Sequence, residues 1–365
     1  MSAKRPFDMK QTENTHNTQR MKDTNKWLVV VNPKAGSGKC EKDWPGIKEL
    51  LVKYNFSFLS VLTEYPFHAI EITRNMVNDL GFTKIIAVGG DGTLNEVVNG
   101  IFQQTRYATT DITLAMITVG TGNDWGRMYH FPLNYEKAIK IISNERTFLQ
   151  DVGKVKYSYE AEDKSRYFVN MAGMGYDAFV AKKTNLQKAK GKGGRFSYLI
   201  NLATGLFQYK SVMLNITVDG EDVVDDQVFT LSIGICKYNG GGMMQLPNAI
   251  PDDGLFDMTV VRKTSKLKVI RNISRLFDGS FLKMSEVSTY TGQKIQIIST
   301  PRHAIFLETD GESLGSSPLD FTIVPRAVRL IVRKKALKQY GQTQPLQESK
   351  PKSKPSTEAI EVAND

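Results

Sequence analysis

The sequence is poor in cysteine and has no long apolar run. Two cysteines, Cys40 and Cys236, are too few for a disulfide framework or a cysteine-based zinc site. The longest mainly apolar stretch without a charged residue, Phe196–Tyr209, is shorter than the ~20 residues that a transmembrane helix needs. The first 26 residues are polar and lack the apolar core of a signal peptide. These absences predict a protein of the reducing cytoplasm.

Histidine is scarce as well. The four histidines, His16, His68, His130 and His303, show no HExxH or paired metal-ligand spacing, which argues against a histidine-ligated metal site. Hydrophobic residues at 41% and charged residues at 24% exclude a wholly disordered chain.

Positive charge, in contrast, is in excess. The chain has 48 Lys and Arg against 38 Asp and Glu, a net charge of +10, which indicates an anionic partner unless it serves solubility alone. The segments Lys182–Arg195 and Arg262–Arg275 each carry six basic residues and no acidic one. Together with the apolar residues of Phe196–Phe207, they suit an anionic membrane surface, with a solvated helix face as the alternative. We find no nucleic-acid recognition motif and expect no nucleic-acid partner.

The chain divides into four parts that differ in composition and in hydrophobic pattern. Residues 1–26 read as a disordered leader and residues 336–365 as a disordered tail. From Trp27 to Tyr129, strands alternate with helices, which predicts a parallel sheet covered on both faces. After about Asp151, short β-rich runs separated by turn signals predict an antiparallel sandwich or barrel. The expected strands are 27–32, 56–62, 84–88, 112–118, 167–171, 212–218, 228–236, 256–261, 294–299, 304–307, 319–324 and 328–332; the expected helices are 41–54, 68–80, 93–102 and 121–129.

Three strands of the first part end in glycine-rich or polar turns that lead into helices. Ligands of parallel α/β sheets bind at the carboxyl ends of the strands, so we expect these turns to meet at one site. The first turn, Asn32–Lys39, resembles a P-loop but has Pro33 and Cys40 where that motif needs Gly and Ser or Thr. It remains a candidate anion site in which Lys34 or Lys39 neutralises phosphate.

The second turn is Gly89-Gly90-Asp91-Gly92-Thr93-Leu94-Asn95-Glu96. Its glycines allow a ligand to approach the backbone, and Thr93 is expected to cap the following helix. A dinucleotide fingerprint would need Gly at Asn95, so an NAD site fits poorly. A carboxylate among phosphate-binding amides needs a cation or a proton, which makes Asp91 a candidate Mg²⁺ ligand or catalytic residue.

The third turn, Gly120-Thr121-Gly122-Asn123-Asp124, repeats this design. Together the three turns resemble the catalytic domain of the diacylglycerol kinase family, which includes bacterial lipid kinases and the sphingosine and ceramide kinases. Gly240–Gly242, Pro247–Ala249, Asp252–Asp257 and Asp310-Gly311-Glu312 extend the resemblance over roughly residues 27–333.

The resemblance implies an NAD kinase-like α/β nucleotide-binding domain, a C-terminal antiparallel β-sandwich domain for the lipid, and a cleft between them. It places residues 27–150 and 326–335 in the first domain and residues 151–325 in the second.

The resemblance also implies the roles of particular residues. Glu312 would be the catalytic base, with Asp310 in reserve, and Asp91 would be catalytic as well. A structural Mg²⁺ would bind Asp253 and the backbone oxygens of Ile250 and Leu255. The nucleotide contacts would be Asn32, Thr63, Gly89, Gly90, Asp91, Gly92, Thr93, Leu94, Asn95, Thr121, Asn123 and Asp124.

The implied activity is transfer of the γ-phosphate of ATP, with Mg²⁺, to the hydroxyl of a membrane lipid. Diacylglycerol is the first expected acceptor, and a sphingoid base or ceramide is the second. An NAD kinase-like enzyme and a catalytically silent nucleotide- or lipid-binding protein remain alternatives. A homodimer is left open.

Overall fold

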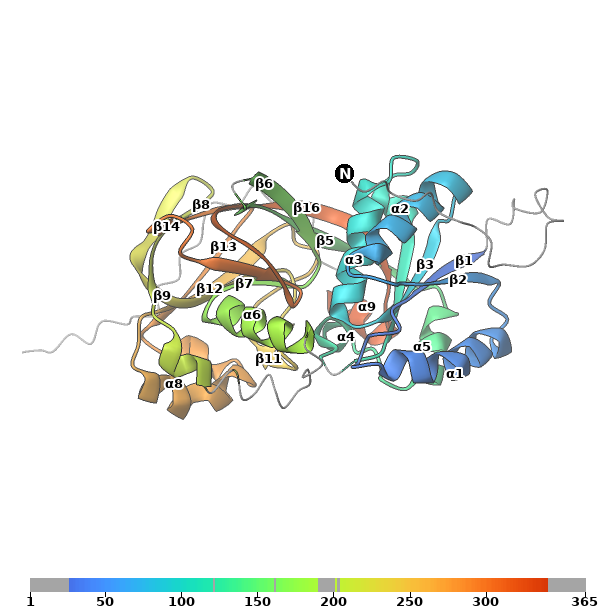
Figure 1. The fold of residues 1–365 in the computed structure, drawn as a ribbon, viewed down its shortest axis with the longest axis horizontal. Helices are drawn as coiled ribbons and strands as arrows, with labels where there is room; N and C mark the ends of the chain where they lie inside the picture. Colours follow the sequence, from blue (N-terminus) through green and yellow to red (C-terminus); the bar gives the residue numbers. More distant parts are fainter. Residues whose placement is uncertain (1–25, 121, 161, 190–200, 202–203, 341–365) are drawn as a thin grey trace, which may run out of the picture.

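The computed structural model describes residues 26–120, 122–160, 162–189, 201 and 204–340. Most of the expected leader and tail, Thr121, and much of the segment Lys182–Phe207 therefore lie outside the described residues. The described part forms two lobes, one α/β and one rich in β-strands (Figure 1).

The α/β lobe contains the expected parallel sheet. Its strands run in the order β16-β4-β3-β1-β2, all parallel. All five residues of β1 are buried, as is usual for a central strand covered on both faces. The elements are β1 (Trp27–Val31), α1 (Lys39–Lys53), β2 (Phe58–Leu62), α2 (His68–Leu80), β3 (Lys84–Gly89), α3 (Asp91–Gln103), η1 (Thr109–Asp111), β4 (Thr113–Thr118), α4 (Asp124–Met128) and α5 (Tyr135–Ile142).

The second lobe is antiparallel, as expected. Six of its strands pair in a closed ring, β7-β9-β8-β14-β16-β15, and its aliphatic and aromatic core is separate from that of the α/β lobe. The elements are β5 (Thr147–Tyr159), β6 (Glu162–Phe168), β7 (Met171–Gly175), α6 (Tyr176–Ala189), β8 (Val212–Val218), β9 (Glu221–Gly234), β10 (Tyr238–Asn239), β11 (Met243–Met244), β12 (Phe256–Arg262), α8 (Lys266–Asn272), η2 (Ile273–Leu276), η3 (Ser280–Lys283), β13 (Val287–Gly292), β14 (Lys294–Thr300), β15 (Phe306–Thr309) and β16 (Glu312–Ile331).

Two long strands, β5 and β16, run through both lobes. The two runs expected at 319–324 and 328–332 belong to the single strand β16, whose register shifts between Val324 and Val328. Pro325 sits in this bulge, where a proline is tolerated because the ladder is already interrupted. The end of β16 then pairs with β4, so the chain returns to the first sheet. The domain boundaries expected at 150/151 and 325/326 lie opposite each other on this ribbon.

The chain beyond β16 differs from the expectation of a tail that begins at residue 336. Helix α9 spans Lys334–Tyr340 and buries Ala336 and Tyr340 against the α/β core. Burial of these two side chains stabilises a segment whose polar composition predicts disorder. Both cysteines are buried and free, in agreement with the expectation. No helix among the described residues is both long and apolar enough to cross a membrane.

Candidate active site

The three turns meet at the carboxyl edge of the parallel sheet, which confirms that expectation. A Cβ added to Gly36 would lie 3.6 Å from the Cα of Gly120, and one added to Gly120 would lie 3.7 Å from the Cα of Gly90. The Asn32 side-chain amide donates a hydrogen bond of 3.0 Å to the hydroxyl of Thr93. The backbones thus pack closely enough to present their amides to one anionic ligand.

The second turn differs in detail from the expectation. Helix α3 begins at Asp91, its N-cap is Gly90, and no side chain caps it. The Thr93 hydroxyl instead accepts from Asn32 and lies 2.4 Å from where a Cβ of Gly89 would stand, so Gly89 has to be glycine. Leu94 is fully buried in the core. Thr93 and Leu94 therefore hold the turn in place, and Gly89, Gly90 and Gly92 form its backbone.

Asp91 and Asp124 form a pair of carboxylates. The oxygens of Asp91 accept hydrogen bonds from the backbone N–H groups of Asp124 (3.1 Å) and Trp125 (3.4 Å). Burial raises the pKa of Asp91, and burial together with the Asp91 charge raises the pKa of Asp124 to about 7. In the described part of the chain, the buried Oδ1 of Asp124 accepts no hydrogen bond, and the Arg127 Nε lies 3.8 Å away. A cation would reduce the repulsion between the two carboxylates and would give this oxygen a ligand, so the pair fits a Mg²⁺ ligand set.

The other predicted nucleotide residues occupy two places around this edge. Thr63 follows β2, and its backbone N–H donates to the Val31 carbonyl at the same end of the sheet. Asn123 adopts a positive φ of 51° and accepts from the Thr118 hydroxyl, so its side chain shapes the third turn from within. Lys39 is engaged by Asp43 and by the Tyr135 hydroxyl. Lys34 is exposed and is the better placed of the two candidate phosphate ligands.

Glu312 faces the second turn from the other lobe. It follows the turn Asp310-Gly311, in which both residues have positive φ, and one of its oxygens would lie 3.2 Å from a Cβ on Gly92. The other oxygen accepts a hydrogen bond of 2.8 Å from Arg166. Burial raises the pKa of Glu312 to about 7, although the Arg166 charge opposes the shift. With 22% of its side chain exposed, Glu312 is accessible enough to accept a proton near neutral pH.

Asp310 is occupied by four hydrogen bonds. Its oxygens accept from the backbone N–H groups of Val169, Asn170 and Met171, each at 3.1 Å, and from the Asn95 amide at 2.8 Å. Burial raises its pKa to about 6. These contacts favour a positioning role over the reserve-base role expected from the sequence.

Asn95 joins the two lobes. Its side chain, fully buried at the start of α3, donates to Asp310 and to the Tyr167 carbonyl and accepts from the Arg166 Nε at 2.9 Å. The nucleotide contact expected for Asn95 is therefore not available to its amide, which instead holds Arg166 and the Asp310 turn against α3. A second link is the backbone N–H of Gly241, which donates to Asp124 at 2.8 Å.

The loop that is expected to hold a structural Mg²⁺ packs against the bulge of β16. Asp151 accepts from the backbone N–H groups of Gly254 and Arg326, both at 2.7 Å. Burial raises the pKa of Asp253 to about 6 and that of Asp151 to about 7, and neighbouring carboxylates add to both shifts. Asp253 also accepts from the Leu255 N–H.

Among the described residues, no three acidic, His or Cys side chains are placed to hold a metal ion. A site built from the Asp253 carboxylate and the carbonyls of Ile250 and Leu255 has the hard oxygen donors that Mg²⁺ prefers.

Arg166 and Asp151 contact the candidate site residues, and the sequence analysis did not single them out. Arg166 lies 146 residues from its partner Glu312, just before an expected strand, and no motif spacing marks it. In the sequence, Asp151 only marks the expected boundary between the two domains. Both act through long-range contacts, for which a local pattern carries no signal.

The two-lobed fold has counterparts among known proteins, and the comparison identifies its family. Residues 26–155 match the family described as the diacylglycerol kinase catalytic domain, and residues 170–332 match the YegS C-terminal NAD kinase beta sandwich-like domain. The chain belongs to the diacylglycerol kinase catalytic family and is a phosphotransferase that acts on an alcohol group.

Named relatives and a solved structure are similar to this chain over most of their length. Diacylglycerol kinase of Staphylococcus aureus (strain bovine RF122 / ET3-1) is 30% identical over 82% of this chain and 90% of its own. Diacylglycerol kinase of Staphylococcus haemolyticus is 29% identical over 91% and 96%. A crystal structure of a diacylglycerol kinase from Bacillus anthracis superposes with a TM-score of 0.63 at 25% identity, over 86% of this chain and 98% of that one.

Proposed function

We propose that the protein transfers the γ-phosphate of ATP to the hydroxyl of a membrane lipid, with diacylglycerol, which gives phosphatidic acid, as the first acceptor to test. A sphingoid base or ceramide is the second. The observation that carries this proposal is the placement of Glu312, a carboxylate with a pKa of about 7, opposite the phosphate-binding turn at Gly92. In this arrangement a base on one lobe faces an anion site on the other.

The chain's own residues account for the steps of phosphoryl transfer. Backbone amides of the three turns and Lys34 hold the phosphates, and Arg166 holds the Glu312 carboxylate in place. Glu312 accepts the proton of the lipid hydroxyl as its oxygen bonds to the γ-phosphorus and ADP leaves. Mg²⁺ would bind Asp91 and Asp124 and would neutralise phosphate charge; a second ion would bind at Asp253 and stabilise the loop.

The proposal is tested with γ-labelled ATP and two classes of acceptor. Lipids in mixed micelles and NAD⁺ in a lipid-free buffer are offered in parallel. We expect label in a lipid and none in NAD⁺. Label in NAD⁺ alone would establish the NAD kinase-like alternative, and ATP binding without transfer to any acceptor would establish the silent binding protein.

The raised pKa of Glu312 predicts how activity depends on pH. A general base must be unprotonated, so kcat/KM should rise through about pH 7 and level off above it. Arg166→Met removes the charge that lowers the pKa of Glu312, so the rise should move to higher pH by about one unit or more. Arg166→Lys keeps a positive charge and should stay closer to wild type. An identical profile for wild type and Arg166→Met would contradict this role of Arg166.

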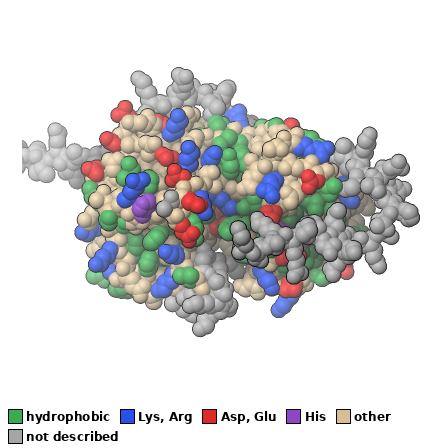
Figure 2. Space-filling view, turned by 45° about the horizontal axis from the view of Figure 1, so that its top comes forward, with side chains coloured by type: hydrophobic (Ala, Val, Ile, Leu, Met, Phe, Trp, Pro, Cys, Tyr) green, Lys and Arg blue, Asp and Glu red, His purple; other side chains and the backbone are tan. Residues whose placement is uncertain are grey.

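We also propose that the enzyme is cytoplasmic and meets the bilayer with the surface around α8. Apolar side chains there are exposed, among them Leu267 at 67% and Phe277 at 53%. Of the cluster Arg262–Arg275, Arg262 and Lys268 form ion pairs with Asp226 and Glu286, whereas the exposed Lys263, Arg271 and Arg275 form no ion pair among the described residues. On the face seen in Figure 2, basic side chains occur over both lobes, so positive charge alone does not distinguish the α8 surface from the rest of the protein.

This surface is tested by binding to vesicles that contain phosphatidylglycerol. The triple change of Lys263, Arg271 and Arg275 to Gln should weaken binding about 100-fold at low salt, because each basic residue near an anionic bilayer contributes ~1 kcal/mol. The same change at the exposed Lys48, Lys137 and Lys140 is the matched control. Equal loss in both triple variants would contradict a specific α8 surface.

A further inference from the structure

Phe67, directly before α2, has a backbone conformation that is unusual for a bulky residue. Its φ is 68°, in the left-handed region, where a residue with a Cβ is strained. Such strain persists where surrounding contacts fix the backbone, and it occurs often at functional sites. Phe67 is also 47% exposed, so burial in a core does not explain it. The reason for a phenylalanine here therefore lies in what its ring contacts.

Hydrogen bonds on both sides of Phe67 hold this conformation. The buried Glu96, on α3, accepts from the backbone N–H groups of Phe67 and Ala69, both at 3.1 Å. The Nδ1 of His68 accepts from the N–H of Glu64 at 3.1 Å, which closes the loop between β2 and α2. The backbone that carries the Phe67 ring is thus tied to α3, the helix that begins at the second glycine turn.

The Phe67 ring lies against Arg166 of the other lobe. The guanidinium carbon of Arg166 is 5.2 Å from the centroid of the ring, within the range of a cation–π contact. The same guanidinium donates to Asn95 at 2.9 Å and to Glu312 at 2.8 Å. Arg166 is only 7% exposed, whereas the four residues before it in β6 are exposed. The contacts with Phe67 and Asn95 across the lobe boundary contribute to this burial.

The contact with the ring fixes the plane of the guanidinium. The donors of an arginine lie in that plane, so a tilt misaligns the bonds to Asn95 and Glu312 together. An apolar ring also keeps water from the guanidinium, and the attraction between Arg166 and Glu312 is then less screened. Loss of the Phe67 ring should therefore let the Glu312 carboxylate leave its place opposite Gly92.

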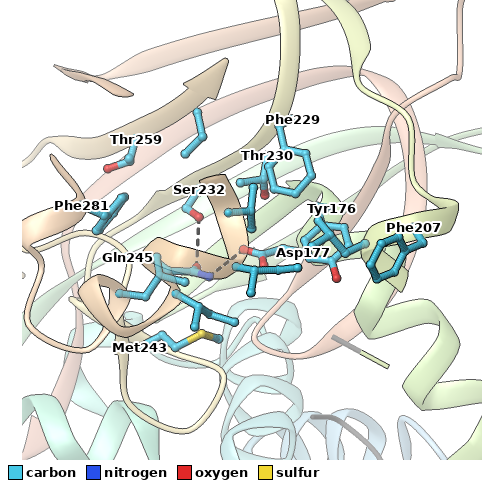
Figure 3. A pocket seen from close by; sticks show the side chains of 16 residues that line it. Tyr176, Asp177, Phe207, Phe229, Thr230, Ser232, Met243, Gln245, Thr259 and Phe281 are labelled. Atoms are coloured by element: carbon cyan, nitrogen blue, oxygen red, sulfur yellow. Dashed lines mark hydrogen bonds between the residues drawn. The ribbon is translucent and has the colours of Figure 1, made fainter. Parts of the chain in front are cut away.

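The turn that carries the proposed base is held by its own lobe. Glu308 accepts from the N–H of Gly311 at 2.8 Å, and the Asn239 amide donates to Glu308 at 3.4 Å and to Gln245 at 3.3 Å. Figure 3 shows the next contact of this chain, in which the Ser232 hydroxyl donates to Gln245 at 3.0 Å. These contacts do not include the loop before α2. Removal of the aromatic ring should therefore leave the backbone of the turn in place and affect the side chain of the base.

We propose that Phe67 is a positioning residue: its ring, presented by the loop between β2 and α2, holds the Arg166 guanidinium in the plane that keeps Glu312 opposite the phosphate-binding turn. This inference rests on the proposed function, in which Glu312 is the base. Phe67 acts through Arg166 and not on the reacting atoms. It links the loop that follows Thr63, a predicted nucleotide contact, to the base on the other lobe.

Phe67→Gly tests the role of the ring, because glycine suits a positive φ and the loop keeps its conformation. The acceptors are diacylglycerol, monoacylglycerol, a sphingoid base and ceramide in mixed micelles. On the plateau of the pH profile, we expect kcat to fall about tenfold, because a small misplacement of a reacting group costs up to ~10²-fold. The KM for ATP should not change. Phe67→Tyr keeps the ring and should restore kcat.

Tyr65→Ala is the matched control. Tyr65 is an aromatic residue of the same loop and is equally exposed at 47%, but its ring stacks on His68. This variant should keep the wild-type kcat. An equal loss in Tyr65→Ala and Phe67→Gly would show that the loop as a whole matters and would overturn the assignment to Phe67.

A double-mutant cycle shows whether the effect passes through Arg166. In the Arg166→Met background, Phe67→Gly should lower kcat little further, because the guanidinium that the ring holds is absent. The full loss in that background, or an unchanged kcat in Phe67→Gly while wild type labels a lipid, would overturn the proposal.

The free energy of unfolding in urea separates this inference from the proposed function, since it needs no substrate. The effect of Glu312→Gln should differ between wild type and Phe67→Gly by at least about twofold in the folding equilibrium constant, the lower end of couplings between linked residues. This coupling without label in any lipid would support the role of the ring and contradict the proposed function. Labelled lipid without the coupling would support the function and overturn the inference.

Discussion

Glu312→Gln should lower kcat for lipid phosphorylation by about 10²–10⁴-fold, the usual contribution of a general base. Gln has nearly the shape of Glu and can still accept a hydrogen bond from Arg166, but it cannot accept a proton at neutral pH. The KM for ATP should change little, because the glycine turns that we propose bind the nucleotide lie on the other lobe. Steady-state kinetics at pH 8 measure both constants.

Glu221→Gln is the matched control, since Glu221 is exposed at the start of β9. It should retain wild-type activity. A Glu312→Gln variant that keeps more than about a tenth of wild-type kcat would contradict the base assignment, because removal of a general base costs at least ~10²-fold.

Asp310→Ala should have the largest effect on stability. The change leaves three buried backbone N–H groups, those of Val169, Asn170 and Met171, and one N–H of the Asn95 amide without their acceptor. An unsatisfied buried donor costs about 1–3 kcal/mol, so we expect the free energy of unfolding to fall by roughly 4 kcal/mol. Urea denaturation followed by circular dichroism measures the loss.

Asp310→Asn retains one acceptor oxygen and should lose less stability than Asp310→Ala. Because Asn95 and the Asp310 turn hold Glu312 opposite Gly92, kcat should also fall in both variants while the protein is still folded. Loss of less than about 1 kcal/mol in Asp310→Ala would show that this network is not the link between the lobes, since a single lost acceptor already costs that much.

Much of the α/β lobe could be predicted because its signals are local. The expected helix 68–80 is α2 with the same bounds, since Gly81, with φ of 75°, ends an amphipathic segment. The turns after β1, β3 and β4 follow from glycine patterns and from the rule that ligands bind at strand ends. The meeting of Gly36, Gly90 and Gly120 at one site could therefore be predicted without knowledge of tertiary contacts.

The connections between the lobes could not be predicted in the same way. β5 contains Asp151 and Gly153, which interrupt its apolar pattern, and β13 shows no clear alternation. The helix α5 was missed although its buried residues Ala138, Ile139 and Ile142 have helical spacing. Asn95 looks like a nucleotide ligand in its motif, yet its partner Asp310 lies 215 residues away. Asp177 and Gln245 meet across 68 residues. Such pairs are specified by topology, which no local pattern contains.

We propose that a base on one lobe and an anion site on the other form one site for phosphoryl transfer to lipid. The most direct measurement is transfer of label from γ-labelled ATP, with Mg²⁺, to lipids in mixed micelles by wild type and by Glu312→Gln side by side. The panel holds diacylglycerol, monoacylglycerol, a sphingoid base and ceramide. We predict a labelled lipid with wild type and almost none with the variant. Labelled lipid in equal amounts from both proteins, or in neither while ATP still binds, would contradict the account.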